Sequence, residues 1–95
     1  MDLGSLDPVA RRERVLVIVK ESLGKVLRLA PERIGDRDRI NELGIDSLMA
    51  LELKYALEYR LGVGVSTPEL LKGPAVSELI DLILSSAVAA EIVQT

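Results

Sequence analysis

The sequence predicts an all-α fold: a small bundle of three main helices and one short helix, with a long loop between the first and second helices. Apolar residues recur at steps of three and four along three stretches, which is the period of an amphipathic helix. Helix-capping or helix-breaking residues border these stretches, and no stretch shows the period of two that is typical of a strand. With 95 residues, 48% of them hydrophobic, the chain is expected to form one domain with one core.

The first helix is expected to begin after Asp7, because aspartate is a favoured N-cap residue and Pro8 suits the first helical position. Pro31 is expected to end the helical pattern, because proline disfavours helical backbone at the residue before it. An apolar stripe of helical spacing lies between them and consists of Val15, Ile18, Val19, Leu23, Val26 and Leu27. This stripe predicts the face that packs on the core.

Residues 31–46 form the predicted long loop. A connection of this length without regular structure is uncommon unless it is anchored or functional. Four aliphatic residues are spaced along the loop and are expected to anchor it in the core: Ile34, Ile40, Leu43 and Ile45.

A second helix is predicted from Asp46 or Ser47 to Leu61, where Gly62 and Gly64 stop it. A helical wheel places two apolar stripes on roughly opposite sides of this helix. One stripe consists of Ala50, Leu53, Leu57 and Leu61, and the other of Leu48, Leu51, Tyr55 and Tyr59. A helix in a small bundle has one core face, so the second stripe is expected to be exposed for docking. Burial of the helix on two sides is the alternative.

The segment "STPELLKGP" predicts a short helical turn closed by Gly73 and Pro74. Either Thr67 caps this turn, or Ser66 forms a capping box with Glu69, and both registers remain open. A last helix is predicted from about Val76, with one apolar side that consists of Val76, Leu79, Ile80, Ile83 and Leu84. We expect one domain over residues 1–95, with a core at about 8–87 and flexible ends.

The composition excludes several classes of function. The chain has no cysteine for a disulfide and no histidine, which excludes His/Cys zinc sites and Ser–His–Asp or Cys–His catalysis. We therefore expect no metal site and no enzymatic activity. Residues 1–34 carry a net charge of +2 and residues 35–95 a net charge of −5, which argues against nucleic acid and suits basic protein partners. Without a long apolar run or a signal peptide, the chain is expected to be cytoplasmic and not associated with a membrane.

Ser47 is the residue that this sequence leaves to be explained. As an N-cap it would be redundant, because Asp46 can cap the second helix and leave Ser47 facing outward. As a hydrolase nucleophile it would lack a histidine base and a G-x-S-x-G elbow. The free N–H groups at a helix N-terminus favour an anion, so Ser47 is well placed to carry a phosphate or a phosphodiester.

The residues "GIDSLMALEL" resemble the attachment motif of acyl carrier proteins, G-h-D-S-L, in which 4′-phosphopantetheine esterifies the serine. The resemblance extends over roughly Val15 to Leu84 and includes all four helices in order. "DSLMALEL" is most similar to carrier domains of modular (type I) polyketide synthases. Fatty-acid carriers commonly have an acidic residue where this chain has Met49, and peptidyl carriers usually have G-G-x-S.

This resemblance implies a function and a set of site residues. Ser47 would receive 4′-phosphopantetheine covalently from coenzyme A through a separate phosphopantetheinyl transferase, and the thiol of the arm would hold growing polyketide intermediates as thioesters. Asp46 would cap the helix and help the transferase dock, Leu48 and Met49 would be apolar contacts beside the arm, and Glu52 would meet basic partner surfaces.

The further partners implied are acyltransferase, ketosynthase and other synthase enzymes, and the isolated chain would be a monomer. Two alternatives remain: a helical adaptor that binds a protein partner through its second helix without modification of Ser47, and a carrier of fatty-acid synthesis.

Overall fold

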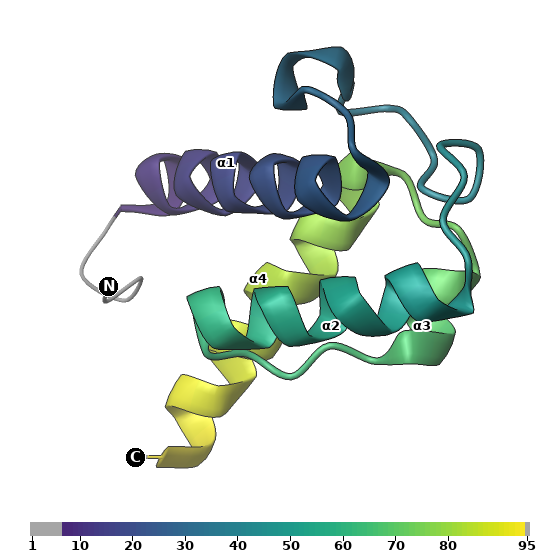
Figure 1. Cartoon of the computed structure of the whole chain (residues 1–95). Helices are drawn as coiled ribbons and strands as arrows, with labels where there is room; N and C mark the ends of the chain where they lie inside the picture. Colours follow the sequence, from purple (N-terminus) through teal and green to yellow (C-terminus); the bar gives the residue numbers. More distant parts are fainter. Residues whose placement is uncertain (1–6, 95) are drawn as a thin grey trace.

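The computed structural model describes the backbone of residues 7–94 and the side chains of residues 7–85. It confirms the all-α prediction, since the described residues form helices and no strand. The elements are α1 (Pro8–Leu27), the short 3₁₀ helix η2 (Pro31–Arg33), α2 (Ser47–Leu61), α3 (Thr67–Leu71) and α4 (Val76–Gln94). In Figure 1, α1 and α2 lie side by side in opposite directions, α4 crosses behind them, and α3 packs near the start of α2.

The helix ends follow from local capping interactions. Asp7 caps α1 as predicted, because its Oδ1 accepts a hydrogen bond of 2.8 Å from the backbone N–H of Ala10. The end of α1 was predicted too late: the helix stops at Leu27, since Arg28 takes a left-handed conformation with φ of 59°. Pro31 instead opens η2, a turn that the apolar pattern did not indicate. Gly62 ends α2, as expected.

One aliphatic core joins the helices, and it contains the predicted faces. Its buried residues include, from α1 and α2, Val15, Ile18, Val19, Leu23, Ala50, Leu53 and Leu57, and from α4, Val76, Leu79, Ile80 and Ile83. The predicted anchors of the long loop are confirmed, because Ile34 and Ile40 are buried and Leu43 and Ile45 pack against the core. The loop is therefore part of the packed structure.

Hydrogen bonds hold the same loop against the connection between α3 and α4. The backbone N–H of Ile40 donates to Pro74 O at 3.0 Å, and Val76 N–H donates to Asp38 O at 3.0 Å. The guanidinium Nε of Arg39 donates to Gly73 O at 3.0 Å. The sequence pattern did not indicate these contacts, which fix the segment that leads into α2.

The C-terminal part of the chain differs in detail from the prediction. Ser66 holds the N-cap position of α3 and Thr67 begins the helix, but no side-chain capping bond forms there, so neither predicted cap is made. The helix α4 runs to Gln94, and the expected core boundary near residue 87 stays a prediction. The predicted flexibility of the N-terminal end concerns residues 1–6, which lie outside the described residues. No helix in the described part of the chain is long and apolar enough to cross a membrane.

Candidate attachment site

Ser47 is the first residue of α2 and its side chain is exposed. Asp46 precedes it in an extended conformation and accepts a hydrogen bond of 2.8 Å at Oδ1 from the backbone N–H of Met49. Asp46 is therefore the N-cap of α2, as the sequence predicted. The Ser47 hydroxyl is left free of the capping role and accessible to another protein.

The position of Ser47 suits a phosphodiester. The backbone N–H groups of Ser47 and Leu48 have no intrahelical acceptor, because they lie in the first turn of α2. The positive end of the helix dipole at this point favours a negative group by about 0.3–1 kcal/mol. A phosphate ester on the Ser47 oxygen would lie near this positive end of the helix dipole without displacing the Asp46 cap.

The Asp46 cap makes a testable contribution to stability. We expect Asp46→Ala to lower the free energy of unfolding by about 0.5–2 kcal/mol, because the N–H of Met49 loses its acceptor. Asp46→Asn should retain most of the stability, since an amide oxygen can accept the same bond. Urea denaturation of both variants measures the difference, and equal losses for alanine and asparagine would show that charge rather than capping matters at this position.

The two faces of α2 have opposite environments. Ala50, Leu53 and Leu57 are fully buried. The opposite face is exposed, with relative residue exposures of 65% for Leu48, 37% for Leu51, 60% for Tyr55 and 92% for Tyr59. We call these four residues the outer stripe. The prediction of an exposed second stripe is confirmed, and the alternative of burial on two sides is wrong.

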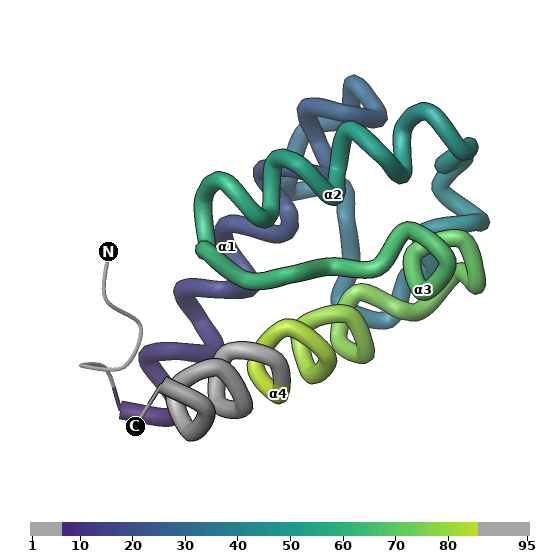
Figure 2. Tube along the Cα trace, turned by 90° about the horizontal axis from the view of Figure 1, so that it is seen from below, coloured from purple at the N-terminus to yellow at the C-terminus, as the bar shows by residue number. Residues whose placement is uncertain are grey.

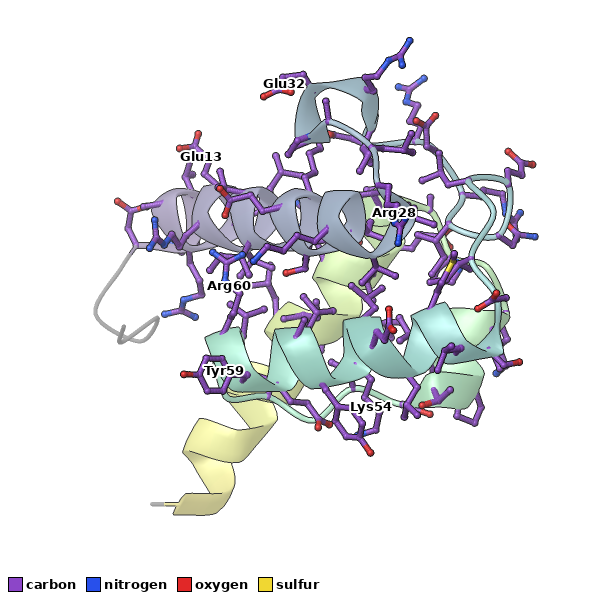
Figure 3. All side chains as sticks on the ribbon, viewed as in Figure 1. Glu13, Arg28, Glu32, Lys54, Tyr59 and Arg60 are labelled. Atoms are coloured by element: carbon purple, nitrogen blue, oxygen red, sulfur yellow. The ribbon has the colours of Figure 1, made fainter. Side chains whose placement is uncertain are left out.

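The remaining predicted docking residues lie beside the outer stripe. Met49 is half-buried, whereas Glu52 is exposed and lies along a shallow groove between α1 and α2. Figure 3 shows Tyr59 at the far end of α2 and Arg60 pointing toward α1, where its guanidinium pairs with Glu21 at 2.9 Å. The structure thus brings Asp46, Ser47 and Leu48 together at the start of α2 and places Glu52 further along.

Residues 17–83 match the family described as "Phosphopantetheine attachment site". The chain belongs to this family. Its members carry covalent 4′-phosphopantetheine, and the family is a non-catalytic one of carrier domains. The resemblance to carrier proteins that the motif indicated is confirmed.

Carrier domain relatives occur in large synthases. The chain is 31% identical over 68 residues, 72% of its length, to the non-reducing polyketide synthase ausA of Emericella nidulans. It is 29% identical over 69 residues, 73% of its length, to the 6-methylsalicylic acid synthase of Penicillium terrestre. It is 36% identical over 63 residues, 66% of its length, to nonribosomal peptide synthetase 8 of Aspergillus fumigatus. The carrier domain spans 3%, 4% and 1% of the lengths of these three proteins.

The fold of the carrier domain also matches a solved structure. This is the free-standing peptidyl carrier protein from an uncharacterized secondary metabolic pathway of Acinetobacter baumannii, with a TM-score of 0.70 and 23% sequence identity. The match covers 78% of this chain and 92% of the other. At this identity the likeness establishes the shared helical fold.

Proposed function

We propose that the chain is a single cytoplasmic acyl carrier domain of polyketide biosynthesis, monomeric when isolated and without catalytic activity of its own. It holds acyl intermediates on a 4′-phosphopantetheine arm attached to Ser47. The observation that carries the proposal is the pairing of an exposed Ser47 with a neighbouring Asp46 that already caps α2, within the residues that match the family. When bound, the arm supplies a thiol that holds the acyl group as a thioester.

The residues of this chain bind and present the arm rather than react with the cargo. Ser47 supplies the oxygen of the ester, and the first turn of α2 favours the negative charge beside it. Asp46, Leu48, Met49 and Glu52 are the proposed contacts for the phosphopantetheinyl transferase and for acyltransferase, ketosynthase and other synthase enzymes. Exposure of Leu48 beside Ser47 and of Glu52 further along α2 supports this assignment.

Mass spectrometry tests the attachment directly. The purified chain is incubated with coenzyme A and a phosphopantetheinyl transferase, and we expect the mass of one phosphopantetheine to be added at Ser47. Fragmentation of the modified chain then locates the added group. An unmodified helical adaptor would gain no mass under the same conditions, and that result would reject the proposal.

A role as a peptidyl carrier is the second candidate, because the chain is 36% identical to nonribosomal peptide synthetase 8 over 63 residues. The two roles differ in the group that is loaded on the arm. Incubation of the modified chain with an acyltransferase and an acyl-coenzyme A, or with an amino-acid-activating enzyme and ATP, separates them. Loading by the acyltransferase supports the polyketide assignment, and loading only with an amino acid supports the second candidate.

Docking on α2 is expected to depend more on apolar burial than on charge. The four charged residues of α2, Glu52, Lys54, Glu58 and Arg60, cancel in net charge. Burial of a leucine side chain contributes about 1.5–3 kcal/mol, whereas an exposed charge pair contributes about 0–1 kcal/mol. We therefore expect Leu48→Ala to weaken partner binding by roughly tenfold and Glu52→Gln by only a few fold.

Calorimetric titration of both variants with the transferase measures this difference. Thermal melting serves as the control, because Leu48 and Glu52 are both exposed and neither variant should lose stability. A larger loss of affinity for Glu52→Gln would show that the acidic side chain governs recognition.

A further inference from the structure

The segment between α2 and α3, residues 62–66, runs back alongside α2, as both Figure 1 and Figure 2 show. We call this segment the strap. It contains no charged residue, and its two valines, Val63 and Val65, are buried. The strap therefore covers part of the core with apolar side chains while its backbone crosses the surface.

A single polar contact joins the middle of the strap to α2. The backbone N–H of Val65 donates to Glu58 Oε2 at 3.1 Å, and Lys54 Nζ donates to the same oxygen at 2.6 Å. Within the described part of the chain, residues 63–65 make no other hydrogen bond. The position of the strap thus depends on the Glu58 carboxylate and on the burial of Val63 and Val65.

This contact lies on the side of α2 that carries Ser47. At about 100° per residue, Ser47, Lys54 and Glu58 fall within roughly 40° of one another around the helix. Glu58 lies about 16 Å from Ser47 along the axis, at a rise of about 1.5 Å per residue. Figure 3 shows Lys54 on the side of α2 along which the strap passes.

The strap also closes a small apolar hollow against α4. The hollow has a volume of about 130 Å³ and a mainly apolar wall. It is lined by Gly64, Val65 and Ser66 of the strap, Glu69 of α3, and Leu79, Leu82 and Ile83 of α4. Leu82 is partly exposed at its edge, whereas Leu79 and Ile83 belong to the core. Movement of the strap away from α4 would join this hollow to the surface beside α2.

We propose that Glu58 is a latch that holds the strap closed, and that release of this latch opens the apolar hollow toward the side of α2 that carries Ser47. The link to Ser47 rests on the proposed function, whereas the latch itself stands on the contacts of Glu58. Glu58 acts here as a positioning residue, because it places the strap and touches no reacting group.

The charges around Glu58 keep the latch closed at neutral pH. The hydrogen bond from Lys54, followed by the hydrogen bond from Val65 N–H, lowers the pKa of Glu58 below its ordinary value. The strap brings no charge toward Glu58. Two charged residues of α3 and α4 pair elsewhere: Glu69, which lines the hollow, pairs with Lys72, and Asp81 pairs with Arg12.

The sign of the pH dependence follows from this lowered pKa. The ionised carboxylate is the form that holds the strap, so the latch is complete above the ordinary pKa of glutamate. It is lost only as the pH falls through the lowered pKa of the folded chain. The Val65 amide should therefore stay protected from hydrogen exchange, after correction for the intrinsic exchange rate, at pH values at which an isolated glutamate is already protonated.

Hydrogen exchange measured by NMR on the unmodified chain tests the latch residue by residue. Glu58→Ala should speed exchange of the Val65 amide by about tenfold or more, because the N–H loses a charged acceptor. Glu58→Gln keeps an acceptor oxygen and should show a smaller effect, and Lys54→Met should be the mildest of the three. Glu52→Ala is the matched control on the same helix and should leave Val65 unchanged.

The exchange of the Leu57 amide separates a latch from a general loss of stability, since Leu57 lies in the fully buried part of α2. Selective acceleration at Val65 supports the latch. Equal acceleration at Val65 and Leu57, or no change at Val65 in Glu58→Ala, would overturn it.

Binding of the apolar dye anilinonaphthalene sulfonate tests the hollow. Glu58→Ala should increase the dye fluorescence relative to the wild type and to Glu52→Ala, because the opened strap exposes apolar side chains. Unchanged fluorescence in Glu58→Ala would overturn the opening of the hollow. All of these measurements use the chain without an arm, so a failure of Ser47 modification would be recognised separately by mass spectrometry.

Discussion

Replacement of Ser47 by alanine is expected to abolish attachment of the arm completely while the chain keeps its helical content and melting temperature. The loss is complete because the hydroxyl oxygen is the atom that forms the ester. Fold is retained because Ser47 is exposed and Asp46 supplies the cap of α2. Mass spectrometry after incubation with coenzyme A and a transferase measures the first effect, and circular dichroism measures the second.

Ser66→Ala is a matched control for this experiment. Ser66 is also an exposed serine at the start of a helix, and its side chain makes no capping bond. The control should gain one arm at the wild-type rate. An arm on Ser47→Ala would place the attachment elsewhere, and a large drop in melting temperature would assign Ser47 a structural role.

The helices could be predicted from the sequence because their signals are local. Period and capping residues located α2 to within one residue, and the wheel separated the buried Leu53 and Leu57 from the exposed Leu48 and Tyr55. The helical period alone could not decide whether the second stripe was exposed, since that depends on which helices surround α2. The small size of the bundle favoured exposure, and the structure confirmed that the stripe is exposed.

The contacts that were missed are hydrogen bonds that tie loops to other parts of the chain. Arg39 meets Gly73 O across 34 residues, and Glu58 reaches forward to the backbone of Val65. Neither contact has a periodic signal, because a single side chain bonded to a backbone group leaves no repeat in the sequence. The end of α1 at Leu27 was missed for a similar reason, since nothing in the sequence indicates that Arg28 takes a left-handed conformation. The helices and the apolar anchors of the long loop were thus predictable, whereas the hydrogen bonds that position the loops were not.

Gly73→Ala is expected to cause the largest loss of stability of the variants considered. Gly73 has a φ of +74°, which costs an alanine about 1–2 kcal/mol. A Cβ at this position would also overlap the side chain of Asn41, which adds about 1–3 kcal/mol of steric strain. The combined loss of about 2–5 kcal/mol is a large part of the stability of a typical small domain.

Gly62→Ala separates the two contributions to this loss. Gly62 has a similar φ of +69°, but no atom lies within 4 Å of the position that its Cβ would take. It should therefore lose only the conformational part, and urea denaturation of the two variants should differ by the steric part. Addition of Asn41→Gly to Gly73→Ala should recover that steric part. Equal losses at Gly62 and Gly73 would show that the contact with Asn41 yields easily.

Gly73→Ala is also expected to alter the position of the attachment site. Gly73 O accepts the Arg39 hydrogen bond, and the neighbouring Pro74 O accepts from Ile40, so these contacts hold the loop that leads into Asp46 and Ser47. We expect displacement of the Asn41 side chain to shift this loop relative to α2. We therefore expect Gly73→Ala, assayed well below its melting temperature, to raise the KM of the transferase for the chain, whereas Gly62→Ala should leave it near the wild-type value. An unchanged KM in Gly73→Ala would show that the loop contacts support the fold without positioning Ser47.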